Sequence, residues 1–178
     1  MRYIAGVLIM SLCAFPQQQK KEPESLAPYF PTPPAIAERM LVMTELKKGE
    51  KMFDLGSGDG RIVIMAANKF KADATGVELD AALHRQSSDE IKRLGLEKTA
   101  RIIHGDILQQ DYSSADVLTV YLLPVSNDKV RPILEKQLKN GTRIVAHDFE
   151  FSGWKPEKVE HVEDDGEGRS HTIYLYRR

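Results

Sequence analysis

Cysteine, long apolar runs and an excess of charge of either sign are all nearly missing from this sequence of 178 residues. The single cysteine, Cys13, excludes an internal disulfide, and no cluster of cysteines and histidines is present, so we expect no metal site. The longest apolar run, residues 3–15, is shorter than the ~20 residues that a membrane-spanning helix needs. A net charge of -1 offers no general attraction to nucleic acid or acidic membranes, so we expect no nucleic-acid partner.

The first 27 residues have the composition of a leader and a linker rather than of a folded domain. Residues 1–15 carry one early positive charge, Arg2, and then an apolar stretch, which is typical of a secretory signal. An uncleaved membrane anchor is the alternative, and bulky Leu12 argues against a lipoprotein cysteine at Cys13. Residues 16–27 are polar and predict a linker, which leaves residues 28–178 as one domain. The leader predicts a membrane-associated or exported protein, with a cytoplasmic protein as the alternative.

Short apolar strands alternate with helical segments over most of this domain. Thr32 is the predicted cap of a first helix, because Pro33 and Pro34 need no N–H partner in its first turn. Ser126 or Asn127 is the predicted start of the last helix. The apolar side chains expected on buried helix faces are Ile36, Met40, Met43, Leu83, Ile91 and Leu94. The predicted strands are residues 51–55, 74–79, 100–106, 116–124 and 142–149, with helices at 60–70, 81–96 and 126–141.

The tail of the chain changes character. Residues 157–165 and 169–178 are extended runs with no helix between them, so they predict an antiparallel hairpin. The strands before them are nearly continuous apolar runs, which favours a parallel sheet covered by helices on both faces. The fold class is therefore α/β, a Rossmann-like sheet of about seven mostly parallel strands with a C-terminal hairpin.

A glycine-rich turn, "GSGDG" at residues 56–60, follows the first strand and precedes the first helix of this sheet. Glycines at this point let backbone approach a ligand closely. The carboxylates of Asp54 and Asp59 oppose a phosphate, and Arg61 occupies the last glycine position of the dinucleotide pattern. The turn therefore predicts a ligand with positive charge and hydroxyls. The residues of this segment that we expect to contact it are Asp54, Gly56, Ser57, Gly58, Asp59 and Gly60.

Two further acids end the next two strands. Glu78 lies 22 residues after Gly56 and can accept hydrogen bonds from both hydroxyls of a ribose. Asp106 ends the third strand and can accept a hydrogen bond from an adenine amine. Acids at three neighbouring strand ends suit an adenosine that carries a cation, and S-adenosylmethionine is such a ligand.

The motifs "DLGSGDGR", "GVELD", "HGDI" and "YLLP" resemble those of the class I S-adenosylmethionine-dependent methyltransferases. With "PTPPAIAERML" and "GTRIVAHDFEFSGWKPE", the chain is similar to protein-lysine methyltransferases of the ATP synthase c-subunit and the adenine nucleotide translocase, and to their prokaryotic relatives. This resemblance covers residues 28–157 and implies methyl transfer from S-adenosylmethionine to a protein lysine. It also implies that Asp80, Ile107 and Tyr121 line the cofactor site.

The reaction needs a neutral lysine amine held in line with the methyl group. Tyr121, at the end of the fourth strand, is placed to line the lysine channel. Asp148, after the fifth strand, is placed to orient the amine or take its proton. No metal is required, and the protein is expected to act as a monomer. The segment before the first helix is predicted to border the channel through Tyr29, Phe30, Thr32 and Pro33.

Two other functions are compatible with the same sequence features. A small-molecule methyltransferase would have the same cofactor residues, and a protein that binds S-adenosylmethionine without catalysis would have them too. A nucleic-acid methyltransferase is disfavoured, because "YLLP" stands where an Asn/Asp-Pro-Pro-aromatic turn is usual and no basic patch is present.

Overall fold

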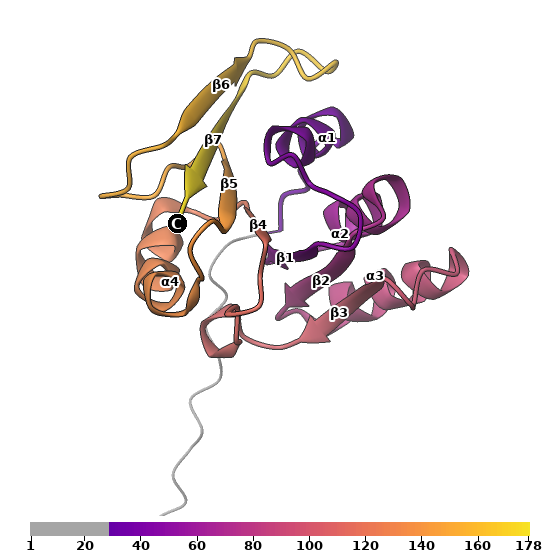
Figure 1. The fold of residues 1–178 in the computed structure, drawn as a ribbon. Coiled ribbons are helices and arrows are strands. Elements are labelled where there is room, and N and C mark those ends of the chain that lie inside the picture. The colour runs from indigo at the N-terminus through magenta and orange to yellow at the C-terminus, as the bar shows by residue number, and fades with distance from the viewer. Residues whose placement is uncertain (1–28) are drawn as a thin grey trace, which may run out of the picture.

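The computed structural model describes residues 29–178 of the chain (Figure 1). The predicted leader, residues 1–15, and the predicted linker, residues 16–27, lie outside the described residues. Within the part of the chain that the structure describes, no helix combines the length and the apolar character required to cross a bilayer.

One seven-stranded sheet organises the fold, with the strand order β3-β2-β1-β4-β5-β7-β6. Strands β1 to β5 pair in parallel, whereas β7 runs antiparallel to both β5 and β6, which confirms the predicted fold class and terminal hairpin. The strands are β1 (Lys51–Leu55), β2 (Asp73–Glu78), β3 (Ala100–His104), β4 (Val117–Val120), β5 (Arg143–His147), β6 (Lys158–Val162) and β7 (His171–Arg177).

Helices cover both faces of the sheet (Figure 1). One apolar core lies under α1 (Pro34–Met43), α2 (Arg61–Met65) with its π-helical continuation (Ala66–Phe70), and α3 (Ala81–Arg93). The other lies under α4 (Pro124–Gln137) and the short 3-10 helix Ile107–Gln109. Strands buried on both faces carry few polar side chains, which explains their continuous apolar sequences.

Two helix starts differ from the sequence prediction. Pro33 and not Thr32 precedes α1, and no side chain caps that helix, because Thr32 Oγ1 lies 3.2 Å from His147 Nδ1 instead. Helix α4 begins at Pro124, two residues before the predicted Ser126, again with no side-chain cap. In both helices proline occupies the first turn, where its missing N–H costs nothing.

The buried helix faces follow the prediction with two exceptions, Leu83 and Leu94. Leu83 of α3 is only half-buried. Ile36, Met40 and Met43 of α1 are buried as expected, and Ile91 of α3 is buried too. Leu94, however, is 40% exposed, because α3 ends at Arg93 and Leu94 is only its C-cap.

Strand order decides where a ligand can bind. The chain passes from β1 to β2 and β3 on one side, then crosses back to β4 and β5 on the other. The connections that follow β1 and β4 therefore diverge and leave a crevice at the carboxyl edge of the sheet.

Candidate functional site

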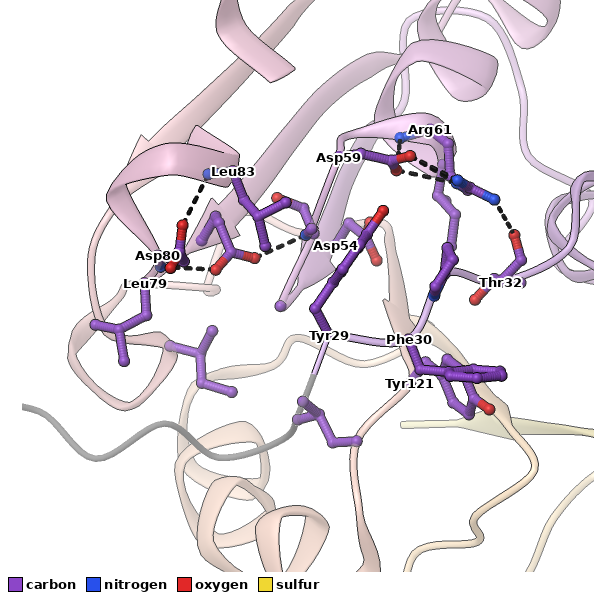
Figure 2. Close-up of a pocket in the computed structure, with 18 of the residues that line it drawn as sticks. Tyr29, Phe30, Thr32, Asp54, Asp59, Arg61, Leu79, Asp80, Leu83 and Tyr121 are labelled. Carbon is purple, nitrogen blue, oxygen red and sulfur yellow. Dashed lines mark hydrogen bonds and ion pairs between the residues drawn. The ribbon is translucent and has the colours of Figure 1, made fainter. Parts of the chain in front are cut away.

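A cavity of about 460 Å³ opens at this edge of the sheet (Figure 2). Its size lies within the usual range for small-molecule sites. Residues that follow the ends of β1, β2, β3 and β4 meet in its lining, together with the segment that precedes α1. The lining residues are Tyr29, Phe30, Pro31, Thr32, Asp54, Gly56, Ser57, Gly58, Asp59, Arg61, Ile62, Glu78, Leu79, Asp80, Ala81, Leu83, Asp106, Ile107, Tyr121 and Leu122.

The glycine turn is held against strand β2 by its own backbone. The N–H groups of Gly56 and Ser57 both donate to Val77 O at 3.0 Å. Gly58 has a φ of +55°, and a Cβ there would stand 2.7 Å from the ring of Tyr29. Gly60 has a φ of +77°, and its Cβ would stand 2.9 Å from Cβ of Ser87 on α3. Glycine is therefore required at these two positions by backbone conformation and by close packing.

Glu78 organises this turn as well as lining the cavity. Its Oε2 accepts from Gly58 N at 2.7 Å, and its Oε1 accepts from Asp80 N at 2.8 Å. The side chain is buried, and the two charged hydrogen bonds fix its carboxylate at the cavity wall. Asp80 in turn caps α3, because its Oδ1 accepts from the N–H groups of Ala82 and Leu83.

Asp54 is the most deeply buried acid of the site. Its Oδ1 accepts from Thr119 Oγ1 at 2.6 Å, and the residue is 4% exposed. Burial raises the pKa of Asp54 to about 7; the bond from Thr119 opposes the shift, and the charges of Glu78 and Asp59 add to it. A cation in the cavity would favour the ionised form of this carboxylate.

The lining carries five carboxylates and one guanidinium, that of Arg61. Arg61 Nη2 pairs with Asp59 Oδ2 at 2.6 Å, and Arg61 Nη1 donates to Thr32 O at 3.0 Å. Arg61, which stands in place of the last glycine of the dinucleotide pattern, thus connects the glycine turn to the segment before α1. Four carboxylates remain without a cationic partner in the lining, so the cavity favours a positively charged ligand.

The segment before α1 crosses the cavity mouth (Figure 2). Tyr29 lies against the glycine turn, where burial and then the charge of Asp59 raise the pKa of its hydroxyl, with Arg61 opposing. Phe30 meets Tyr121 edge to face, with ring centroids 6.5 Å apart. These contacts give the cavity an aromatic wall on the side of β4.

Behind this wall lies a polar cluster at the ends of β5 and β7. The ring of His147 packs on Tyr121 with centroids 3.9 Å apart, and Tyr121 OH donates to Asp148 Oδ2 at 3.4 Å. His171 Nδ1 lies 2.9 Å from His147 Nε2 and 3.1 Å from Asp148 Oδ2. Burial, followed by the charge of Asp148, raises the pKa of Tyr121 to about 12. Burial also lowers the pKa of His147 to about 4, so this imidazole is neutral at physiological pH.

Most of the sequence-predicted site residues come together at the cavity. Three do not line it. Gly60 packs against α3, Pro33 is buried at the start of α1, and Asp148 lies behind Tyr121 with a φ of +56°. The residues that the sequence prediction missed are Pro31, Arg61, Ile62, Leu79, Ala81, Leu83 and Leu122. The apolar residues among them could not be recognised as site residues from the sequence, because the same residue types occupy ordinary core and loop positions.

Comparisons with known proteins give relatives for this chain. The family model of the ANTKMT methyltransferase domain matches residues 54–158. A protein-lysine N-methyltransferase of Saccharolobus islandicus (strain REY15A) is 42% identical over 150 residues, which are 84% of this chain and 92% of that relative. The human lysine N-methyltransferase of the ATP synthase c-subunit is 30% identical over 84% of this chain, which spans only 60% of that protein.

A solved structure is similar over nearly its whole length. It is the crystal structure of an RNA methyltransferase from Salinibacter ruber in complex with S-adenosyl-L-homocysteine. The TM-score is 0.76 and the identity 38%, and the match covers 83% of this chain and 93% of that one.

Proposed function

We propose that this chain methylates a lysine side chain of a protein, because it belongs to the ANTKMT methyltransferase family. It is an S-adenosylmethionine-dependent methyltransferase, and S-adenosylmethionine is its cofactor. The lysine substrate is supported by the names of the Saccharolobus islandicus and human relatives. The observation in the structure that carries the proposal is an aromatic wall, Phe30 and Tyr121, beside an acid-lined cavity. The catalytic unit we propose is the domain of residues 28–178.

The residues present fit the cofactor. A sulfonium and an ammonium suit a lining with four carboxylates that lack a cationic partner there. The buried Ser57 Oγ has no hydrogen-bond partner among the described residues and belongs to the same lining. Leu79, Leu83 and Ile107 offer apolar surface next to Glu78, which suits an adenine ring beside a ribose. The bound cofactor supplies an electrophilic methyl group, and the chain supplies orientation and exclusion of water.

The acceptor amine must be neutral when it attacks. Removing the proton of a free lysine with a pKa near 10.4 costs about 4.6 kcal/mol at pH 7. Placement against Phe30 and Tyr121 disfavours the ammonium form by desolvation and reduces this cost. A carboxylate in contact would have the opposite effect, so the role that we propose for Asp148 is to hold Tyr121 through its hydroxyl.

The segment of residues 29–33 is the proposed border of the lysine channel. It covers the cavity with Tyr29 and Phe30, and its backbone is tied to Arg61 through Thr32 O. Phe30→Ala should lower methylation at least tenfold and leave the urea midpoint of unfolding nearly unchanged. Val42→Ala on α1 is the matched control, because Val42 is 57% exposed and Phe30 54%. Equal activity of the two variants would show that the segment is only a tether.

The decisive experiment identifies the acceptor. The purified chain is incubated with cofactor labelled in the methyl group and with separate protein, RNA and metabolite fractions. We expect label in protein, released by protease and located on lysine by mass spectrometry. Label that is sensitive to ribonuclease would favour the activity named for the Salinibacter ruber protein, and label in metabolites a small-molecule methyltransferase. Cofactor binding without label in any fraction would indicate a protein that binds without catalysis.

Membrane association through residues 1–15 remains a separate proposal, which rests on composition alone. Fractionation of cells that express the full chain or residues 28–178 tests it. Equal partition of both forms into the soluble fraction would contradict it.

A further inference from the structure

Three side chains behind the cavity bring their ligand-type atoms unusually close together. His147 Nε2 lies 2.9 Å from His171 Nδ1 and 3.3 Å from Asp148 Oδ2. The third edge, from His171 Nδ1 to Asp148 Oδ2, measures 3.1 Å. The three atoms therefore form a nearly equilateral triangle. The two histidines are buried, and the Asp148 side chain is 25% exposed.

We propose that His147, Asp148 and His171 bind a divalent first-row transition metal ion such as Zn²⁺ or Fe²⁺. Nitrogen and carboxylate ligands stand ~2.0–2.2 Å from zinc, so ligands of one ion lie roughly 2.9–3.5 Å apart in octahedral and tetrahedral geometry. All three edges fall within that range. Two imidazoles and one carboxylate on one face are a known ligand set for such ions, and they leave further coordination positions for water.

The hydrogen bond at the outer nitrogen of His171 fixes which ring atom enters the triangle. His171 Nε2 lies 3.2 Å from Asp165 Oδ2, and a carboxylate only accepts, so that nitrogen carries the proton. Nδ1, on the other side of the ring, faces Asp148 Oδ2 and His147 Nε2. A single proton among these atoms makes one well-directed hydrogen bond, with the third atom at best a bifurcated partner. One metal ion at the centre would contact all three atoms at once.

The groups around the triangle have the arrangement that metal ligands need. A ligating histidine usually bonds through its other nitrogen, which fixes the ring orientation. Asp165 takes this role for His171, and Thr32 Oγ1 takes it for His147 at 3.2 Å. The carboxylate of Asp148 is held by Thr172 N, which donates to Oδ1 at 2.9 Å. Each of the three ligands is therefore positioned by a second group.

The location gives the ion a structural role. His147 ends the parallel strand β5 and Asp148 follows it. His171 begins β7, and Thr32 belongs to the segment that covers the cavity. None of the three ligands lines the cavity, so this site is separate from that of the cofactor. An ion there would join the terminal hairpin to β5 and, through Thr32, to the cavity cover.

Metal binding by the full chain tests the proposal without any measurement of methyl transfer. Protein treated with chelator and dialysed is titrated with Zn²⁺ and, under anaerobic conditions, Fe²⁺, with Mg²⁺ and Ca²⁺ as oxygen-preferring controls. We expect one Zn²⁺ or Fe²⁺ per chain and no saturable binding of Mg²⁺ or Ca²⁺. His171→Ala should weaken binding at least a hundredfold. His84→Ala is the matched control, since His84 stacks on His104 at 5.1 Å without a carboxylate ligand set.

Two additional variants keep the result interpretable. Cys13→Ser removes the only thiol, so zinc bound by that variant cannot depend on a cysteine. Asp148→Asn preserves shape and decides the question if His171→Ala fails to fold by circular dichroism. Absence of stoichiometric metal binding, or binding that survives both His171→Ala and Asp148→Asn, overturns the proposal. The cluster would then be a hydrogen-bond network only, and the methyltransferase proposal would stand unchanged.

Discussion

The buried carboxylate of Asp54 makes a testable contribution to the pH dependence of stability. Its pKa is about 7 in the folded protein, whereas the ordinary value for an aspartate side chain is 3.8. Between these two values the folded protein retains a proton that the unfolded chain has lost. The free energy of unfolding therefore falls as the pH rises through this window, and the loss is complete above the folded pKa. At 1.36 kcal/mol per pKa unit the full loss is about 4 kcal/mol, which is an upper limit.

Asp54→Asn should remove this dependence. Asparagine keeps the oxygen that accepts from Thr119 and has no proton to lose. Near pH 4, where Asp54 is protonated in the folded state, the two proteins should differ little. At pH 8 the variant should be more stable than the wild type by up to about 4 kcal/mol.

Urea unfolding at half-unit steps from pH 4.5 to 8.5 measures both curves. Thr119→Val serves as a second variant with a different expected effect, because loss of the Thr119 hydroxyl raises the pKa of Asp54 further. The pH window of that variant should extend to higher pH. Parallel stability curves for wild type and Asp54→Asn would refute the assignment of a raised pKa to this carboxylate.

Three further substitutions probe the cavity. Glu78→Ala removes a carboxylate that holds the glycine turn through two charged hydrogen bonds, each worth ~1.5–3 kcal/mol. Both the affinity for S-adenosylmethionine, measured by calorimetry, and the stability in urea should therefore fall. Unchanged values of both would mean that this carboxylate is not an anchor. Gly58→Ala places a Cβ 2.7 Å from the ring of Tyr29 and should weaken cofactor binding. Adding Tyr29→Ala to that variant should restore part of the lost affinity, and strictly additive effects of the two substitutions would contradict the close contact. Tyr121→Phe keeps the ring packed on His147 and should lower kcat with little change in cofactor affinity, whereas lost affinity at normal kcat would assign Tyr121 to the cofactor alone.

The sheet and its order of helices were predictable because their signals are local. Strand β1 occupies the residues expected from its apolar run, and the terminal hairpin follows from two extended segments without an intervening helix. The predicted starts of α1 and α4 were wrong because both helices begin with a proline in the first turn and have no side-chain cap. The hydroxyl of Thr32 contacts His147 instead of capping α1. A residue that can cap a helix has other partners available once the chain is folded.

Some residues of the candidate site could also be predicted from the sequence, and others could not. Acids at the ends of neighbouring parallel strands converge by geometry, so Asp54, Glu78 and Asp106 could be grouped from their positions alone. The cluster of His147 and His171 could not, because 24 residues and a change of strand direction separate the two rings in sequence. The second function of Glu78, as acceptor from Gly58 N, was also hidden, since residue type does not determine the backbone direction of a turn.

The position of β7 means that the sheet can be completed only after nearly the whole chain has been synthesised. This strand follows all others along the chain, yet it lies between β5 and β6. A nascent chain that has not yet left the ribosome through residue 177 exposes the unpaired edge of β5, and β6 has no partner to dock against. Such an edge invites pairing with another chain. We therefore expect translation products that stop before residue 171 to aggregate rather than form a smaller working domain.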